Sequence, residues 1–520
     1  MRLLYTMILL SVFGLVESQP YYNTSIPNKF VSENAFLTKT IDTSALPIFA
    51  NIKYKLPQPY WPSRPDALRC YWFAWEIAFR NTLKPIPQSG FLSPFIDAAF
   101  NGNLFMWDSG FMLMFGRYGI QAFNFQQTLN NFYAKQHSDG FICREIKEKD
   151  GTDLFHKNDP SSTGPNILPW CEWEYFLNYN DTLRLKEVFP PLLAYYQWFH
   201  TNRTWPDGSY FSSGWGCGMD NQPRVPGGEI EAVAWWDNGH MSWIDITLQE
   251  IFAAKILIKI AAVINRTNDV ADIINEVDTL TNYVNKKMWD DQTSFYYDRF
   301  SDGKLSSTKS IASFWALLAE VVPAHRLNNF IMHLENKNEF ARKHRVATLS
   351  ADNPLFNPDG GYWQGSIWAP TNYMVLRGLT NNKKDSLAFE IALNHYNNVT
   401  EVFNATGTLW ENYAPDKVHG NNRKDFVGWT GLVPIAVLFE YIFGLRPDVP
   451  NNTLVWDIRL IDEFGVDNYP FGKNGKLSVH VKKRTDAKQM PDIKIKSNII
   501  FNLKLIWAGG SKVMIIKKTS

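Results

Sequence analysis

Hydrophobic residues recur at helical spacing over most of this chain, from about Tyr71 to Leu445. A repeat of three to four residues is typical of helices that bury one face. The segments with this spacing are Tyr71–Leu83, Ile120–Gln136, Leu183–His200, Met241–Ile264, Ser310–Val322, Thr371–Leu379, Leu387–Asn397 and Leu432–Phe443. The pattern predicts a mainly α-helical body.

The segments between these helices are rich in Trp, Gly, Asn and Asp, which favour loops. They include Phe105–Gly110, Ile167–Glu174, Ser212–Arg224, Ala234–Gly239, Gly360–Pro370 and Leu409–Gly420. Helices joined by long aromatic loops over several hundred residues suggest a helical toroid whose loops gather at one mouth. An irregular helical bundle with a similar number of helices is the alternative.

The pattern changes at both ends of the chain. Residues 19–68 are polar and contain Pro, and we predict an N-terminal arm that precedes a helical domain at 69–447. Alternating or β-branched segments follow at Thr453–Leu460, Lys476–Lys482, Ile493–Ile506 and Lys512–Lys518. We predict a small β region at 448–520 that packs on the helical body, with a separate sugar-binding module as the alternative.

Residues 1–18 have the pattern of an export signal. Arg2 precedes an apolar stretch that ends at Val16, and small residues before Gln19 offer a cleavage site. A signal anchor is the alternative, but the apolar stretch is shorter than the roughly 20 residues that span a membrane. We expect a secreted protein without stable membrane insertion, with the lysosome and the endoplasmic reticulum lumen left open. The glycosylation sequons of such a protein are Asn23, Asn180, Asn202, Asn265, Asn398, Asn404 and Asn451.

Composition narrows the class of partner. The formal net charge is +1, and Lys and Arg are scattered, which argues against nucleic acid or an anionic membrane as partner. The chain has 20 Trp, and their grouping in polar loops is not what core packing alone predicts. The four cysteines lack the paired spacing of a zinc site, and we predict no metal and no cofactor. Disulfide pairing and oligomeric state stay open.

Two loops carry the carboxylates that fit best with hydrolysis of a glycoside. This reaction needs one carboxyl group to protonate the leaving oxygen and a second to activate water. Asp220 follows Trp215, whose apolar ring favours the protonated form, so Asp220 is the candidate acid. Glu411 stands between Trp410 and Tyr413 and is the candidate base. A turn aspartate and a surface glutamate are the alternatives.

Other residues of the aromatic loops are candidates for binding sugar. Asp108 follows Trp107 and could accept hydroxyl hydrogen bonds, cap the following helix, or do both. Arg224 could also pair with a loop carboxylate, and Trp368 could be a core residue. The predicted substrate-binding residues are Trp107, Asp108, Trp215, Arg224, Trp236, Asp237, Trp363, Gln364, Gly365, Trp368 and Trp410.

Five motifs, in this order, resemble those of glycoside hydrolase family 63 and its relatives, which include mannosylglycerate hydrolase-like and trehalase-like enzymes. The motifs are Met106–Phe111, Gly218–Arg224, Tyr362–Trp368 with Asn372 and Tyr373, Glu411–Pro415 and Phe426–Val433. The resemblance extends over about residues 99–447, and the segment 457–472 also resembles that of bacterial members.

The resemblance implies an (α/α)6 barrel that hydrolyses an α-linked glycoside with inversion. It assigns the acid to Asp220 and the base to Glu411, and it implies that Trp107, Asp108, Trp363, Gly365 and Trp368 line the pocket for the cleaved sugar. Two departures leave the substrate open. Gln364 stands where many relatives carry Arg, and the chain has no room for the large N-terminal β domain of the eukaryotic processing glucosidases.

We therefore predict a secreted inverting α-glycosidase that acts on an α-linked glucoside or mannoside, such as an oligosaccharide. Two alternatives belong to other classes. A catalytically silent carbohydrate-binding protein would keep the pocket without turnover. An epimerase or lyase on the same fold would need His or Tyr residues as proton carriers.

Overall fold

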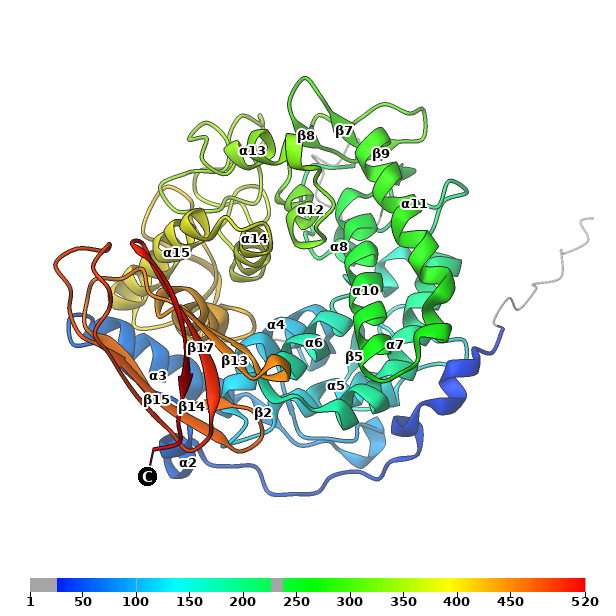
Figure 1. Cartoon of the computed structure of the whole chain (residues 1–520). Helices are drawn as coiled ribbons and strands as arrows, with labels where there is room; N and C mark the ends of the chain where they lie inside the picture. The colour runs from blue at the N-terminus through cyan, green and yellow to red at the C-terminus, as the bar shows by residue number, and fades with distance from the viewer. Residues whose placement is uncertain (1–25, 100, 226–236, 520) are drawn as a thin grey trace, which may run out of the picture.

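The computed structural model describes residues 26–99, 101–225 and 237–519, and it confirms a mainly helical fold. The longer helices are arranged around the centre of the molecule in Figure 1. The helices are α2 (Phe49–Ile52), α3 (Pro65–Arg80), α4 (Met106–Gly116), α5 (Thr128–Ala134), α6 (Leu168–Tyr179), α7 (Thr182–Asn202), α8 (Gly214–Cys217), α10 (Ile244–Val263), α11 (Ala271–Lys287), α12 (Trp315–Leu318), α13 (Ala324–Met332), α14 (Ala369–Asn381), α15 (Asp385–Thr406) and the π-helix η11 (Val433–Ile442). No helix in the described ranges is both long and apolar enough to cross a membrane.

Most of the predicted helices are present, but two predicted loops are wrong. Helices α4 and α6 begin inside the segments Phe105–Gly110 and Ile167–Glu174. Every residue of α4 is buried, and so are most residues of α6, so neither shows the one-sided pattern of an amphipathic helix. Two predicted helices are much reduced: 120–136 becomes a 3₁₀ turn and the short α5, and 310–322 becomes a 3₁₀ turn and the short α12.

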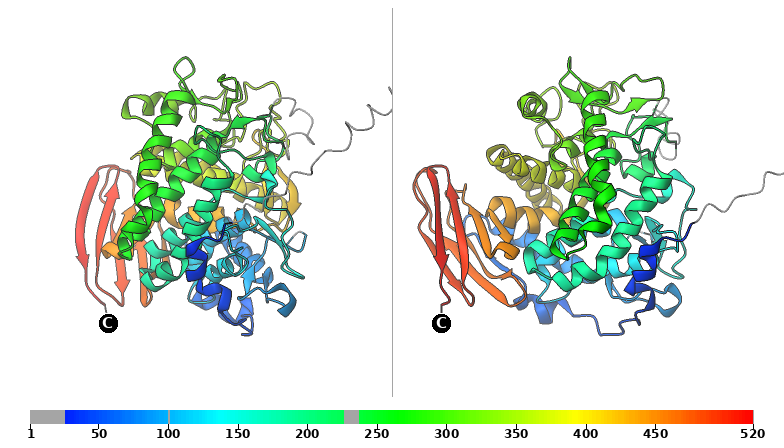
Figure 2. Two further views of the ribbon diagram at one scale, coloured as in Figure 1. Left: turned by 90° about the vertical axis from the view of Figure 1, so that its right-hand side faces the viewer. Right: turned by 45° about the vertical axis from the view of Figure 1, so that its right-hand side comes forward.

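The C-terminal region forms two four-stranded sheets (Figure 2). One has the order β1-β14-β15-β16, where β1 (Gln58–Tyr60) comes from the N-terminal arm. The other has the order β12-β13-β17-β18, with β13 and β17 parallel and all other pairs of both sheets antiparallel. The strands are β12 (Leu445–Asp448), β13 (Thr453–Asp457), β14 (Phe464–Phe471), β15 (Gly475–Val481), β16 (Ile493–Ser497), β17 (Phe501–Trp507) and β18 (Gly510–Ile516). The single predicted segment Ile493–Ile506 is divided into β16 and β17, which belong to different sheets.

Aromatic contacts hold this β region together and attach it to the helices. Phe471 and Phe501 join the two sheets, with ring centroids 5.3 Å apart. Tyr469 of β14 lies against Phe439 of η11, and Phe464 stacks on Phe443 just after it. The β region therefore packs directly on the helical body.

The N-terminal arm contributes to both parts of the molecule. Its strand β1 (Gln58–Tyr60) pairs with β14, while Phe36 is buried against Tyr133 of α5. Near residues 29–38 it forms 3₁₀ turns, capped by the side chains of Asn28 and Asn34. The arm is therefore an integral layer of the fold.

The predicted glycosylation sites differ in how far their asparagines are exposed. Asn23 and the predicted signal at 1–18 lie outside the described residues. Exposed asparagines occur at Asn180, Asn202, Asn265, Asn404 and Asn451. The prediction for Asn398 is wrong, because this residue is 1% exposed inside α15 and leaves no room for a glycan.

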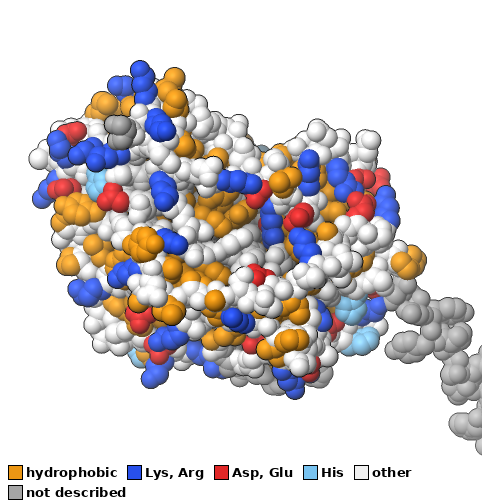
Figure 3. Space-filling model, turned by 90° about the horizontal axis from the view of Figure 1, so that it is seen from below, with side chains coloured by type: hydrophobic (Ala, Val, Ile, Leu, Met, Phe, Trp, Pro, Cys, Tyr) orange, Lys and Arg blue, Asp and Glu red, His pale blue; other side chains and the backbone are white. Residues whose placement is uncertain are grey.

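On the face shown in Figure 3, basic and acidic side chains are interspersed.

A buried group of opposite charges ties four helices together. Arg117 follows α4, and its guanidinium donates to Glu440 of η11 at 2.6 Å. Arg377 of α14 pairs with Glu174 of α6 and, at 3.3 Å, with Glu440. Tyr373 also donates to Glu440 at 2.8 Å. Two cations and two anions thus neutralise one another in a largely buried site.

We predict that Glu440→Gln lowers the free energy of unfolding by about 3–5 kcal/mol, because it leaves buried arginine charge without its partner. Thermal and denaturant unfolding followed by circular dichroism measure this loss. Asp492→Asn is the control, since Lys482 and Asp492 form an ion pair whose side chains are 76% and 66% exposed. A change within about 1 kcal/mol is expected there. Equal effects of the two substitutions would contradict the role given to the buried group.

Candidate active site

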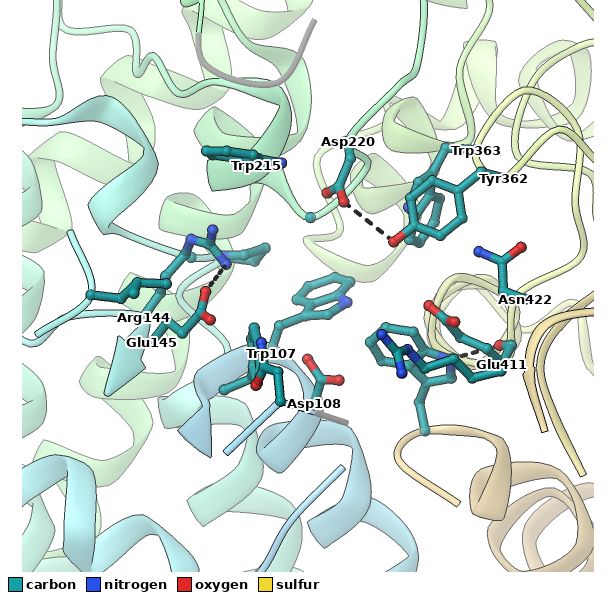
Figure 4. Close-up of a pocket in the computed structure, with 18 of the residues that line it drawn as sticks. Trp107, Asp108, Arg144, Glu145, Trp215, Asp220, Tyr362, Trp363, Glu411 and Asn422 are labelled. Carbon is teal, nitrogen blue, oxygen red and sulfur yellow. Dashed lines mark hydrogen bonds and ion pairs between the residues drawn. The ribbon is translucent and has the colours of Figure 1, made fainter. Parts of the chain in front are cut away.

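A cavity of about 600 Å³ lies among the loops that precede several helices (Figure 4). Four tryptophans contribute to its wall: Trp107, Trp215, Trp363 and Trp429. Asp108, Glu145, Asp220 and Glu411 provide its carboxyl groups, and Arg144 and Arg423 its cations. Flat apolar rings beside hydrogen-bonding groups are what a sugar ring requires of a binding site.

The loop that carries Asp220 is fixed to the neighbouring loop at 360–368. Asn221 donates to the carbonyl oxygen of Gly361 at 3.1 Å and accepts from the backbone N–H of Trp363 at 2.9 Å. The hydroxyl of Tyr362 donates to Oδ2 of Asp220 at 3.3 Å. Burial raises the pKa of Asp220 to about 6, although the charge of Arg144 and the hydrogen bond from Tyr362 act in the opposite direction. This carboxyl group therefore exchanges its proton near neutral pH.

Glu411 lies in strand β10 (Trp410–Tyr413), which pairs with β11 (Gly420–Lys424). The register of this pair shifts between Trp410 and Asn412, so Glu411 sits at an irregularity that can redirect a side chain. Its carbonyl oxygen accepts the indole N–H of Trp429 at 2.8 Å. Burial raises the pKa of Glu411 to about 7, with Arg423 opposing the shift and Asp220 adding to it. Both candidate catalytic carboxyl groups thus border one cavity.

Asp108 occupies the first turn of α4 and does not cap it, because Phe105 holds the N-cap position. Its side chain is 4% exposed, and Oδ1 has no hydrogen-bond partner in the structure. Burial, with the nearby charge of Glu411, raises its pKa well above the usual range. A buried oxygen of this kind on the cavity wall is suited to bind a substrate hydroxyl.

Two tryptophans that were predicted to bind substrate form a stack. Trp363 lines the cavity, and Trp368 lies behind it with ring centroids 3.9 Å apart and planes 5° from parallel. Trp368 thus supports the wall and does not line it. Gly365 and Gln364 also lie outside the lining, and the side chain of Gln364 donates to the carbonyl oxygen of Asn221. Residue 364 therefore braces the Asp220 loop.

The structure corrects three further predictions of substrate binding. Arg224 is buried and bidentate to both Asp245 and Asp298, with contacts of 2.7–2.8 Å. Trp410 is not among the residues that line the cavity, and its indole N–H donates to the hydroxyl of Thr406 at 3.1 Å. Asp237 is exposed and accepts the N–H of Gly239 in a turn. Trp236 lies outside the described residues.

Several lining residues were not among the predicted binding residues: Arg144, Glu145, Phe155, Tyr362, Asn422, Arg423 and Trp429. Tyr362 and Trp429 lie within the recognised motifs, so the sequence could have indicated that they line the cavity. Arg144 and Arg423 lie in stretches without a motif, and only folding brings them to the cavity.

The described residues hold no group of three or more His, Cys, Asp or Glu placed to bind a metal. All four cysteines are buried free thiols, and burial raises the pKa of Cys217 well above its usual value. The described lining contains no histidine. The carboxyl groups of this aromatic cavity can transfer protons between water and a bound sugar.

Comparison with known proteins agrees with this chemistry. Residues 102–430 match the model of the Mannosylglycerate hydrolase MGH1-like glycoside hydrolase domain. This match includes Trp107, Asp220 and Glu411 and covers more than half of the chain. The protein belongs to this family and is a glycoside hydrolase.

Individual relatives are distant. A protein of Borreliella burgdorferi without a described function is 24% identical over 370 residues, which are 69% of this chain and 75% of that protein. The probable mannosyl-oligosaccharide glucosidase of Schizosaccharomyces pombe is 24% identical over 48% of this chain, and the match spans 34% of its length. The GH63 mannosylglycerate hydrolase of Thermus thermophilus, solved with glucose, is 18% identical, with a TM-score of 0.57 over 69% of this chain and 98% of that one. The structural likeness supports the fold.

Proposed function

We propose that this protein is an inverting α-glycosidase of the secretory pathway that hydrolyses an α-linked glucoside or mannoside. The observation that carries the proposal is the pair of buried carboxyl groups, Asp220 and Glu411, on one tryptophan-lined cavity. Both pKa values are raised toward neutrality, to about 6 for Asp220 and about 7 for Glu411. Because the base has the higher value, the productive state, with Asp220 protonated and Glu411 ionised, is a minor fraction even between these two values. On this proposal the helical body is an (α/α)6 barrel with the cavity at its mouth.

The proposed mechanism follows from these positions. Asp220 gives its proton to the glycosidic oxygen while Glu411 removes a proton from a water molecule. That water attacks the anomeric carbon from the face opposite the leaving group, so an α-glycoside yields a β-sugar. Trp107 and Trp363 hold the cleaved ring, and Asp108 accepts its hydroxyl hydrogen bonds. Tyr362 orients the Asp220 carboxyl group through its hydrogen bond.

The relatives supply the sugar class. A probable mannosyl-oligosaccharide glucosidase and a mannosylglycerate hydrolase name glucose and mannose as the two glycones to test first. Catalytic silence is less well supported than turnover, because Gln364 braces the Asp220 loop and both carboxyl groups are retained at the cavity.

We predict that Asp220→Asn and Glu411→Gln each lower kcat on an α-linked oligosaccharide by about 10²–10⁴-fold, because each removes one proton transfer. The two variants should differ in their rates on the α-glycosyl fluoride of the same sugar, because fluoride leaves without being protonated. Asp220→Asn keeps most of its fluoride hydrolysis, whereas Glu411→Gln loses it. Initial rates by sugar and fluoride release measure both effects. Equal losses on the fluoride would overturn the assignment of acid and base.

We predict a bell-shaped dependence of kcat/KM on pH for oligosaccharides, with its maximum between about pH 6 and 7. Activity falls at lower pH because Glu411 becomes protonated, and at higher pH because Asp220 loses its proton. With the glycosyl fluoride the alkaline decline disappears, since only Glu411 must be ionised. Initial rates of both substrates from pH 4 to 9 test this; an alkaline decline shared by both substrates would contradict it.

A further inference from the structure

A second hollow of about 650 Å³ adjoins the cavity. The two share Asn101, and the lining of the hollow also includes Asn103, Glu148 and three lysines, Lys84, Lys147 and Lys149. Asn101 is exposed, so a ligand can pass across it from one hollow to the other. The catalytic scheme above uses none of these residues.

The ridge between the two hollows is made of hydrogen-bonding groups. It is formed by strands β4 (Asn103–Phe105) and β5 (Glu145–Lys147), which pair antiparallel. Asn103, on the hollow, donates to Oε1 of Glu145, on the cavity, at 2.7 Å. The backbone N–H of Asn103 donates in turn to Oδ1 of Asn101 at 3.1 Å. Amide and carboxylate groups therefore run continuously from the cavity to the hollow.

This ridge lies on the side of the cavity where the leaving group must depart. Arg144 is close enough to Asp220 for its charge to oppose the effect of burial on the carboxyl pKa. Figure 4 shows Arg144, Glu145 and Trp215 together on one side of the cavity, and Glu411 with Asn422 on the other. A general acid must lie next to the oxygen that it protonates, whereas the base lies with the attacking water. The side that holds Arg144 and Glu145 is thus the side of the leaving group.

The groups on that side suit a neutral sugar. Arg144 is paired with Glu145 at 3.5 Å and donates to the carbonyl oxygen of Ser161 at 2.6 Å. Its charge is therefore offset beside the cavity. The ring centroid of Phe155 lies 4.5 Å from Cζ of Arg144 and 5.8 Å from the ring centroid of Trp215. Phe155 and Trp215 thus form an aromatic surface beside Arg144.

We propose that the leaving group is an oligosaccharide of at least two sugar units, of which the first is neutral. The first unit lies on Trp215 and bonds to Arg144 and Glu145, and the second crosses Asn101 into the adjoining hollow. This inference rests on the proposed glycosidase function and adds to it the length of the leaving group and the neutral character of its first unit.

The test is a series of substrates that share one cleaved sugar and one linkage: the α-glycosyl fluoride, the disaccharide, the trisaccharide and the glycoside of glycerate. For wild type we expect kcat/KM for the trisaccharide to exceed that for the disaccharide by about tenfold, the size of one or two hydrogen bonds. Asn101→Ala and Asn103→Ala should each reduce this ratio several-fold. Asn275→Ala, an exposed position on α11, is the matched control and should leave the ratio unchanged.

Equal kcat/KM for the disaccharide and trisaccharide would overturn the proposal, and so would a ratio that neither variant changes. A preference for the anionic glycerate glycoside over the disaccharide would also overturn it. Failure of the glycosidase function itself is distinguishable, because wild type would then fail to hydrolyse the fluoride, which needs no leaving-group site. Thermal unfolding of each variant checks that its fold is retained.

Discussion

The neutralisation of buried charge between helices is the constraint on which the site depends. Arg117, Glu174, Arg377 and Glu440 belong to or adjoin four different helices and share one set of contacts. Burial alone would raise the pKa of Glu174, but the charges of Arg377 and Arg117 hold it below its usual value. Helices joined in this way cannot slide past one another without exposing unpaired charge, which costs several kcal/mol.

The same helices begin at the cavity. α4 starts beside Trp107 and Asp108, α14 starts just after Trp368, and η11 follows Trp429 by a short 3₁₀ turn. Ion pairs toward one end of these helices therefore fix the positions of the cavity residues at the other. A rigid frame of this kind lets carboxyl groups remain buried near one another with raised pKa values, because the surrounding side chains hold their positions.

The sequence predicted the helical class, most of the C-terminal strands and the loops that border the cavity, because each leaves a local trace. Strands β12 and β14 were not among the predicted segments. In amphipathic helices such as α3 and α15, hydrophobic residues recur at helical spacing. The recognised motifs mark the loops that carry Asp220 and Glu411. Helix α11 carries such a trace too, in Ile273, Val277, Leu280 and Val284, yet it was not among the predicted helices.

Other features depend on tertiary contacts and could not be predicted locally. Helix α4 is buried on every side, so no polar face marks it. Arg224 is indistinguishable in sequence from a substrate-binding cation, and only the positions of Asp245 and Asp298 show that its charge is already used. Arg144 reaches the cavity through the pairing of β4 with β5, a contact across about forty residues of chain.

The stereochemistry of the released sugar tests the central claim most directly. Purified protein would be incubated with α-linked gluco- and manno-oligosaccharides, including trehalose, and the first anomer released followed by proton NMR before mutarotation. Inversion at a site with Asp220 as acid and Glu411 as base predicts that the β-anomer appears first, with wild type and not with Asp220→Asn. Initial release of the α-anomer would contradict the account, as would sugar binding without turnover across the whole panel.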